Sequence, residues 1–145
     1  MEVIVNVSSS SSCKELLIRA RACIGVSTYK RRAVLEESPQ VLNCFRFTQW
    51  LWKPLGISLP DHQLIWPEAI PIDLTEVGIA DLVFVPRSDY RIDEDDFGHV
   101  GVATGENTVI HATKWKNGVV EEPLPQFVAR GCLGVRRVPL PHCRP

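Results

Sequence analysis

Apolar residues between Asn43 and Gly56 follow the repeat of a helix. Phe47, Trp50 and Leu51 stand at i, i+3 and i+4, which places them on one helical face. Asn43 is a good residue for the N-cap of a helix, and Gly56 suits the position just past a helix end. The pattern therefore predicts a buried helix between these two residues.

A second helix is predicted nearer the N-terminus. Ser12 and Glu15 have the spacing of a capping box, and apolar residues continue after them at helical spacing. We expect the helix from about residue 13 to residue 23. Residues 1–12 combine a short apolar piece with a run of serines, which is typical of a flexible segment. We expect residues 13–145 to form one domain.

Short apolar runs follow in the second half of the chain, each bounded by residues that favour turns. The runs at 99–103 and 108–112 are separated by four residues that include Gly105, which is typical of a β-hairpin. Three further strands are predicted at 81–86, 118–121 and 133–138. Helices that precede an antiparallel sheet indicate the α+β class.

The length of 145 residues suits a single domain, and a hydrophobic content of 45% supports a core. A net charge of −1 gives no reason to expect nucleic acid as the main partner. No apolar run approaches the roughly 18 residues that a membrane span needs. The N-terminus lacks the basic start of a signal peptide, so we expect a cytoplasmic protein, with secretion by another route left open. The five cysteines form no CxxC pair, and reduced thiols are the default expectation.

Cys44 directly follows the predicted N-cap of the helix at 44–55. Backbone N–H groups and the helix dipole favour negative charge in this first turn, and a thiolate is the nucleophilic form of cysteine. Cys44 is therefore a candidate nucleophile. The alternative is a small buried apolar residue, because unpaired cysteines are among the most buried residue types.

His99 and His111 flank the turn of the predicted hairpin. Antiparallel pairing brings these positions to the same end of the hairpin, and residues directly opposite one another share a face. With Cys44 they supply a nucleophile, a base for its proton, and a second imidazole that orients the first. Two alternatives stay open: two partly buried structural histidines, or a zinc site formed by these three side chains.

Four blocks of sequence together resemble the NlpC/P60 family of cysteine peptidases. They occur in the family's order over roughly residues 13–138, so the resemblance covers most of the chain. The family's usual forms are Asp-Cys-Ser-Gly-Phe with Gly-Ile-x-Leu-Pro, then Gly-Asp-Leu-Val-Phe, His-Val-Gly-Ile and Ile-His-Ala. The matching segments are Asn43 to Phe47 with Gly56 to Pro60, Ala80 to Phe84, Gly98 to Val102, and Val109 to Ala112.

The resemblance implies a papain-like α+β fold in which the helix of the catalytic cysteine packs on a C-terminal antiparallel sheet. It implies hydrolysis of an amide in cell-wall (peptidoglycan) peptides, typically the bond between D-glutamate and a diamino acid. Cys44 would be the nucleophile, His99 the base and then the acid, and His111 the orienting residue. Thiol chemistry of this kind needs no metal and no organic cofactor, so we expect neither. We expect a peptide as the partner, no membrane association, and a monomer.

The chain departs from the family pattern beside the nucleophile. Asn43 replaces an aspartate, Phe45 a serine and Arg46 a glycine. We expect Phe45 and Arg46 to contact the substrate and to narrow or recharge the cleft. The family also carries a tyrosine near the site, for which Tyr29 is the candidate, although an ordinary surface tyrosine fits its surroundings as well.

These departures leave other functions open. One is a non-catalytic papain-like module that binds peptides, and another is a hydrolase or acyltransferase that acts on a different amide or acyl substrate. The acidic run around Asp93 to Asp96 is either a solvated loop or a negative rim that attracts an amine-bearing substrate.

Overall fold

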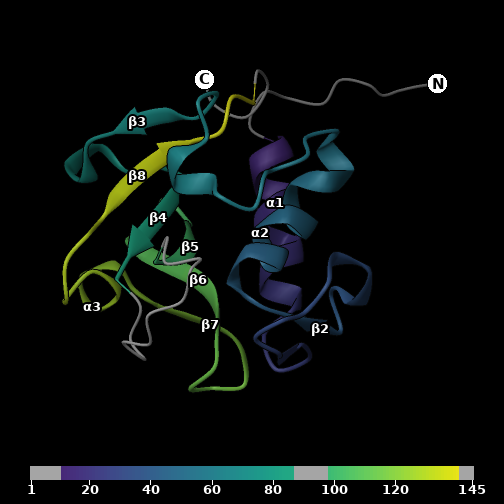
Figure 1. The fold of residues 1–145 in the computed structure, drawn as a ribbon. Coiled ribbons are helices and arrows are strands. Elements are labelled where there is room, and N and C mark those ends of the chain that lie inside the picture. Colours follow the sequence, from purple (N-terminus) through teal and green to yellow (C-terminus); the bar gives the residue numbers. More distant parts are fainter. Residues whose placement is uncertain (1–10, 87–97, 141–145) are drawn as a thin grey trace.

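Two layers make up the computed structural model, which describes residues 11–86 and 98–140 (Figure 1). The helices α1 (Ser11–Ala22) and α2 (Cys44–Trp52) pack together on one side, and a six-stranded sheet forms the other. The predicted α+β class is confirmed. The predictions for residues 1–10 and for the acidic run at 93–96 lie outside the described residues.

Helix α2 begins where the sequence predicts. Asn43 has extended backbone geometry, and its side-chain oxygen accepts a hydrogen bond from the backbone N–H of Arg46 at 2.8 Å. The buried face includes Phe47 and Leu51, which are 0% exposed. The helix ends at Trp52, earlier than predicted, because Pro54 has no N–H to continue the α-helical hydrogen bonds. A single 3₁₀ turn, Lys53–Leu55, leads to a left-handed Gly56 with φ of 80°.

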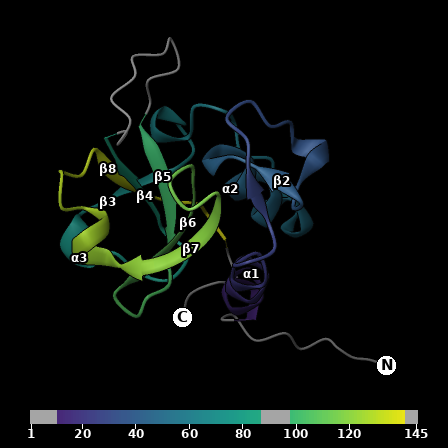
Figure 2. The same cartoon turned by 90° about the horizontal axis from the view of Figure 1, so that it is seen from below.

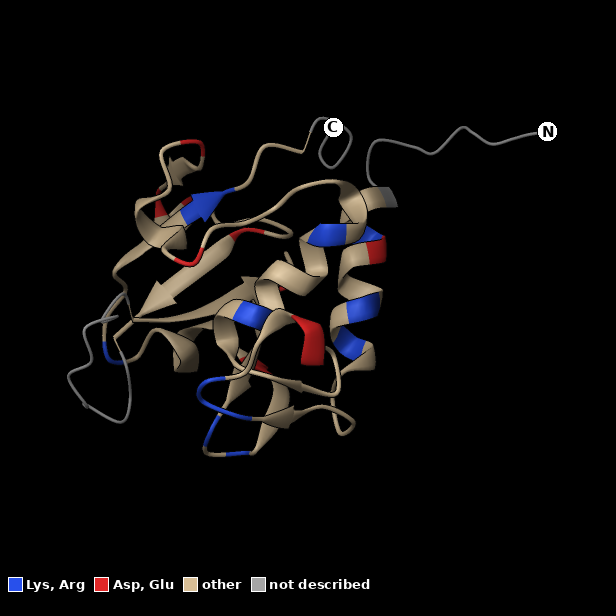
Figure 3. Cartoon of the chain, turned by 45° about the vertical axis from the view of Figure 1, so that its right-hand side comes forward, with Lys and Arg blue, Asp and Glu red and all other residues tan. Residues whose placement is uncertain are grey.

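Helix α1 already includes Ser11 and Ser12, so Ser12 is not its cap as predicted. Its buried side contacts α2, and its charged side chains are the basic Lys14, Arg19 and Arg21 and the acidic Glu15 (Figure 3). Cys13 on the buried side is disulfide-bonded, contrary to the expectation of reduced thiols. Sequence spacing alone gives no sign of that bond, because pairing depends on which Cβ atoms the fold brings together. Cys23, Cys44 and Cys132 are not in disulfide bonds.

All neighbouring strands of the main sheet run antiparallel, in the order β3-β8-β4-β5-β6-β7 (Figures 1 and 2). The five predicted strands are confirmed. The sequence missed β3 because Pro71 interrupts its pattern, but an edge strand tolerates proline. The strands are β3 (Ile70–Ile72), β4 (Leu82–Val85), β5 (His99–Ala103), β6 (Thr108–Thr113), β7 (Gly118–Pro123) and β8 (Gly134–Arg137).

Smaller elements complete the described part of the chain. A two-stranded parallel sheet joins β1 (Thr28–Tyr29) to β2 (Val41–Leu42), directly before α2. The short helix α3 (Leu124–Phe127) follows β7. Further 3₁₀ turns lie at Leu35–Glu37, Gln63–Ile65 and Leu74–Glu76. Within the described ranges, no helix has the length and apolar character needed to cross a membrane.

The main sheet has a buried cluster on each face. Val100, Val102, Ile110 and Ala112 belong to the cluster that α1 and α2 cover. The opposite cluster includes Ala103, Val109 and Phe127 and lies beneath α3. Because side chains alternate along a strand, His99 and His111 lie on the second face, together with Ala103 and Val109.

A buried ion pair joins β8 to the start of β4. Asp81 is 0% exposed, and its two carboxylate oxygens accept hydrogen bonds from Nε and Nη2 of Arg137 at 2.9 and 2.8 Å. One of these oxygens also accepts the backbone N–H of Gly78 at 2.8 Å. Asp81 raises the pKa of Arg137 above its ordinary value through this hydrogen bonding. The ion pair therefore holds the start of β4, which is the neighbour of β5 in the sheet.

Candidate active site

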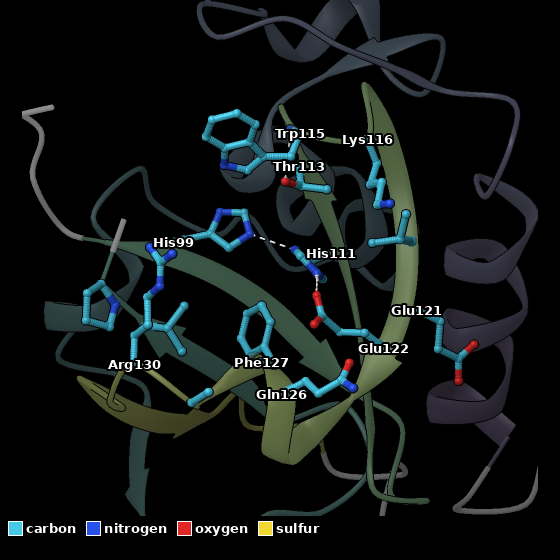
Figure 4. Close-up of a pocket in the computed structure, with 14 residues that line it drawn as sticks. His99, His111, Thr113, Trp115, Lys116, Glu121, Glu122, Gln126, Phe127 and Arg130 are labelled. Atoms are coloured by element: carbon cyan, nitrogen blue, oxygen red, sulfur yellow. Dashed lines mark hydrogen bonds and ion pairs between the residues drawn. The ribbon is translucent and has the colours of Figure 1, made fainter. Parts of the chain in front are cut away.

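His99 and His111 are in direct contact. Nε2 of His99 lies 2.7 Å from Nδ1 of His111, and the two rings meet edge to face at 81° (Figure 4). The hairpin pairs Val102 with Ile110, and continuing that ladder places His111 opposite Gly101. The histidines are therefore diagonal neighbours, not directly opposite as predicted, and the diagonal separation still lets long side chains meet.

Gly101 makes the space for this pair. A Cβ atom at Gly101 would lie 3.2 Å from the Cβ of His111, 3.0 Å from Phe127 and 2.4 Å from Val109. Real side chains do not tolerate the last of these separations. The aromatic ring of Phe127 lies against both histidines, with ring centroids 4.7 Å from His111 and 5.8 Å from His99. Glycine is thus required at this position for the two imidazoles and Phe127 to pack together.

Glu122 on β7 holds the other nitrogen of His111. The carboxylate of Glu122 contacts Nε2 of His111, whose side chain is 7% exposed. Burial lowers the pKa of His111 below its ordinary value of 6.5, while the hydrogen bond and charge of Glu122 act in the opposite direction. Glu122 was not predicted as a site residue, because the predicted strand ends at Glu121 and the observed β7 continues to Pro123. The alternation of β7 against β6 is the signal that could have found it.

Cys44 is the first residue of α2, and α2 packs against β5 and β6, the strands that carry the histidines. The geometry of an α-helix leaves the first-turn N–H groups without an acceptor inside the helix. Cys44 is 6% exposed and belongs to the core cluster on the helix side of the sheet. The structure therefore joins His99 to His111 and places Cys44 on the helix that covers their strands.

A cavity of about 530 Å³ opens beside the histidine pair (Figure 4). His99, His111 and Phe127 line one part of it. The lining continues on β7, on α3 and on the turn that follows β6, where Trp115 is 67% exposed. Cys44 is not among the described residues that line it. Its other polar and charged lining residues are Thr113, Lys116, Glu121, Glu122, Gln126 and Arg130.

Tyr29 lies close in the fold to the segment that leads into α2. It pairs with Leu42 in the parallel β1–β2 sheet, and the next residue, Lys30, donates its backbone N–H to the carbonyl of Leu42 at 3.0 Å. The tyrosine side chain is partly buried against the helix-side core. It is therefore not an ordinary surface tyrosine, and its role in substrate binding stays a prediction.

Arg46 has partners within the fold. Its Nε donates to the carbonyl of Ala33 at 3.0 Å, and its Nη1 contacts Gln49 at 2.8 Å and Asp61 at 2.6 Å. The Arg46 guanidinium, with help from Gln49, lowers the pKa of Asp61. The charge of Arg46 is thus balanced, and its contacts tie the start of α2 to two loops. Phe45 is partly buried against the helix-side core. For both residues, contact with substrate stays a prediction.

Metal coordination finds no support in the described ranges. No group of three or more histidine, cysteine, aspartate or glutamate side chains there has an arrangement that could hold a metal ion. The zinc hypothesis for Cys44, His99 and His111 needs such a group.

No protein-family model and no curated protein sequence matches the chain. Solved structures do match it. An NlpC/P60 family protein from Bacillus cereus has a TM-score of 0.71 at 23% identity, over 89% of this chain and 40% of that one. An NLP/P60 family protein from Staphylococcus aureus, described as similar to a lipoprotein, has a TM-score of 0.70 at 21% identity, over 95% and 45%.

The chain has the NlpC/P60 fold. The peptidoglycan hydrolase RipB from Mycobacterium tuberculosis shares this fold with a TM-score of 0.69 at 16% identity, over 93% of this chain and 68% of that one. The chain spans less than half the length of the Bacillus and Staphylococcus proteins. The NlpC/P60 resemblance seen in the sequence is thereby confirmed for the fold. At these identities the likeness extends to the fold and not to the chemistry of individual residues.

Proposed function

We propose that this chain is a cysteine hydrolase of the NlpC/P60 type that cleaves an amide bond in cell-wall peptides. The observation that carries the proposal is the 2.7 Å contact between His99 and His111 on strands that the Cys44 helix covers. Two linked imidazoles and a cysteine at a helix N-terminus are the groups that thiol-based acyl transfer requires. The fold shared with a peptidoglycan hydrolase supports the class of substrate.

Each group has a role in the proposed mechanism. His99 takes the proton of the Cys44 thiol, and the thiolate attacks the carbonyl carbon of the amide. The oxyanion accepts hydrogen bonds from donors that include the Cys44 backbone N–H, and one such donor contributes roughly 3 to 4 kcal/mol in the transition state. His99 then gives the proton to the leaving amine as the C–N bond breaks, a step that contributes about 10²–10⁴-fold. Water, deprotonated by His99, hydrolyses the thioester and restores the thiol.

Within this class, we propose the bond between D-glutamate and a diamino acid as the target. The cavity beside His99 offers an apolar wall at Phe127 and cationic side chains at Lys116 and Arg130. Such a surface suits a peptide segment that carries a carboxylate. Tyr29, Phe45 and Arg46 remain the candidates for further contacts with substrate near the nucleophile.

The direct test uses purified muropeptides of known structure and mass spectrometry of the products. We expect hydrolysis of one amide bond by the wild type, with the products together heavier by one water. Cys44→Ser and His99→Ala should form no product, and the control Cys132→Ser should retain activity. A wild type that leaves every muropeptide intact, or a Cys44→Ser variant that remains active, would contradict the proposal.

One observation favours a second candidate, a peptide-binding module without catalysis. Cys44 is only 6% exposed and does not line the cavity beside the histidines. A binding module would take up muropeptides without turnover. It would also bind them equally well after Cys44→Ser, so calorimetry on that variant together with the product analysis separates the two candidates.

A further inference from the structure

Glu122 extends the histidine pair to a chain of three groups. Its carboxylate contacts Nε2 of His111, and Nδ1 of the same ring lies 2.7 Å from Nε2 of His99. Figure 4 shows the three side chains in a row, with one interaction on each side of His111. Both ring nitrogens of His111 are therefore engaged, while one ring nitrogen of His99, Nδ1, is outside this chain.

The carboxylate dictates the direction of every hydrogen bond in the chain. An ionised carboxylate only accepts, so Nε2 of His111 carries a proton. Burial lowers the pKa of His111, which favours the neutral ring and leaves Nδ1 as an acceptor. Nε2 of His99 must then donate to it, because one of the two nitrogens has to carry the hydrogen. In neutral His99 this places the lone pair on Nδ1.

We propose that Glu122 is a positioning residue that acts through His111 to hold His99 in the tautomer whose Nδ1 accepts a proton. The same carboxylate stabilises the imidazolium that His99 becomes, through the hydrogen bonds of the neutral His111 between them. This inference rests on the proposed function, in which the accepted proton comes from the Cys44 thiol. Glu122 itself does not accept that proton.

Neighbouring charges provide a matched control. Lys116, Arg130 and Glu121 line the same cavity as Glu122. Glu121 is adjacent in sequence but points away from the histidines (Figure 4). It contacts Arg21 at 3.1 and 3.2 Å and accepts a hydrogen bond from Thr108 at 2.7 Å. Glu121→Gln thus removes the same charge from the same strand without altering a contact of His111.

The test compares two alkylating reagents on Cys44, with peptide mapping by mass spectrometry to separate Cys44 from the other thiols. Iodoacetate is an anion and iodoacetamide is neutral. The rate constant for iodoacetate divided by that for iodoacetamide is therefore higher when a positive charge lies beside the thiolate. This ratio should fall as the pH rises and the His99 imidazolium loses its proton. The proteins are the wild type, Glu122→Gln, Glu122→Asp and Glu121→Gln, all at low ionic strength.

We expect Glu122→Gln to move the midpoint of this fall down by about one pH unit, since loss of a nearby opposite charge disfavours the imidazolium. Glu122→Asp should return the midpoint toward that of the wild type, and Glu121→Gln should leave it unchanged. An unmoved midpoint in Glu122→Gln, or equal shifts in both glutamine variants, overturns the inference. The proposed function itself fails if, in the wild type, the ratio does not change with pH and Cys44 reacts with the pH dependence of an ordinary thiol.

A measurement on the wild type keeps the inference testable even if the Glu122 variants fold poorly. The ¹⁵N chemical shifts of the imidazole nitrogens identify which nitrogen carries the proton in each ring. At a pH where both rings are neutral, we expect the proton on Nε2 of both His99 and His111. A proton on Nδ1 of His111 would overturn the assigned direction of the chain.

Discussion

His99 meets His111 diagonally across Gly101, and the space that Gly101 leaves is what permits their 2.7 Å contact. The geometry of the pair thus depends on a residue that takes no part in the chemistry. The same relationship explains why the ring of Phe127 can lie against both imidazoles. Backbone and aromatic packing together set the position of the proposed base.

Gly101→Ala should separate the two imidazoles. The added methyl group would clash with Val109 and press on His111 and Phe127, and a misplacement near 1 Å costs about 100-fold in rate. We expect the rates of Cys44 alkylation and of muropeptide hydrolysis each to fall by about 100-fold. Gly78→Ala is the control, because a Cβ there meets its nearest atoms at 3.4 and 3.8 Å. Equal activity in both variants would show that the space at Gly101 is not needed.

Arg137→Met should destabilise the fold strongly. It removes the guanidinium from the buried carboxylate of Asp81, and breaking a buried pair by removing one partner costs about 3 kcal/mol or more. Urea unfolding followed by circular dichroism measures the change. The neighbouring Arg136→Met is the matched control, since within the described part of the chain Arg136 donates to the backbone carbonyls of Leu64 and Val135 and to no carboxylate. Equal losses in the free energy of unfolding in both variants would show that the ion pair does not stabilise the fold more than the contacts of Arg136 do.

The pair of Arg46 and Asp61 predicts a pH dependence of stability. Arg46 and Gln49 lower the pKa of Asp61 in the folded chain from its ordinary value of 3.8. A lowered folded-state pKa contributes stability that is fully present above the unfolded value and is lost as the pH falls through the folded value. Wild type should therefore exceed Asp61→Asn in stability near neutral pH, and the difference should vanish in acid. A difference that persists unchanged at low pH would exclude this origin.

Local signals in the sequence predicted the elements that carry the site. The N-cap at Asn43 and the helical repeat after it gave the start of α2, because both depend on neighbouring residues only. The β5–β6 hairpin followed from alternation and a turn-forming segment. Its register did not, because Gly105 and Asn107 both adopt positive φ and set the turn around Glu106. With this turn, the residue opposite His111 is Gly101 and not His99.

Features that depend on contacts between distant parts of the chain could not be predicted from the sequence. The contact of Glu122 with His111 requires the pairing of β7 with β6, and alternation along β7 gives the face of Glu122 but not its partner. The contacts of Arg46 with Ala33 and Asp61 form only when two loops fold around α2, so no local pattern predicts them. Strand β3 depends on pairing with β8, which compensates for the proline in its middle.

The central claim is that Cys44 is a nucleophile activated by His99. The most direct measurement is the rate of Cys44 alkylation by iodoacetamide against pH, read by mass spectrometry, in wild type and His99→Ala. We expect Cys44 of the wild type to react well below the ordinary thiol pKa of about 8.5, and to slow markedly in His99→Ala. Cys132, which is also a free thiol, serves as the internal reference. A Cys44 that reacts like an ordinary thiol in both proteins would contradict the claim.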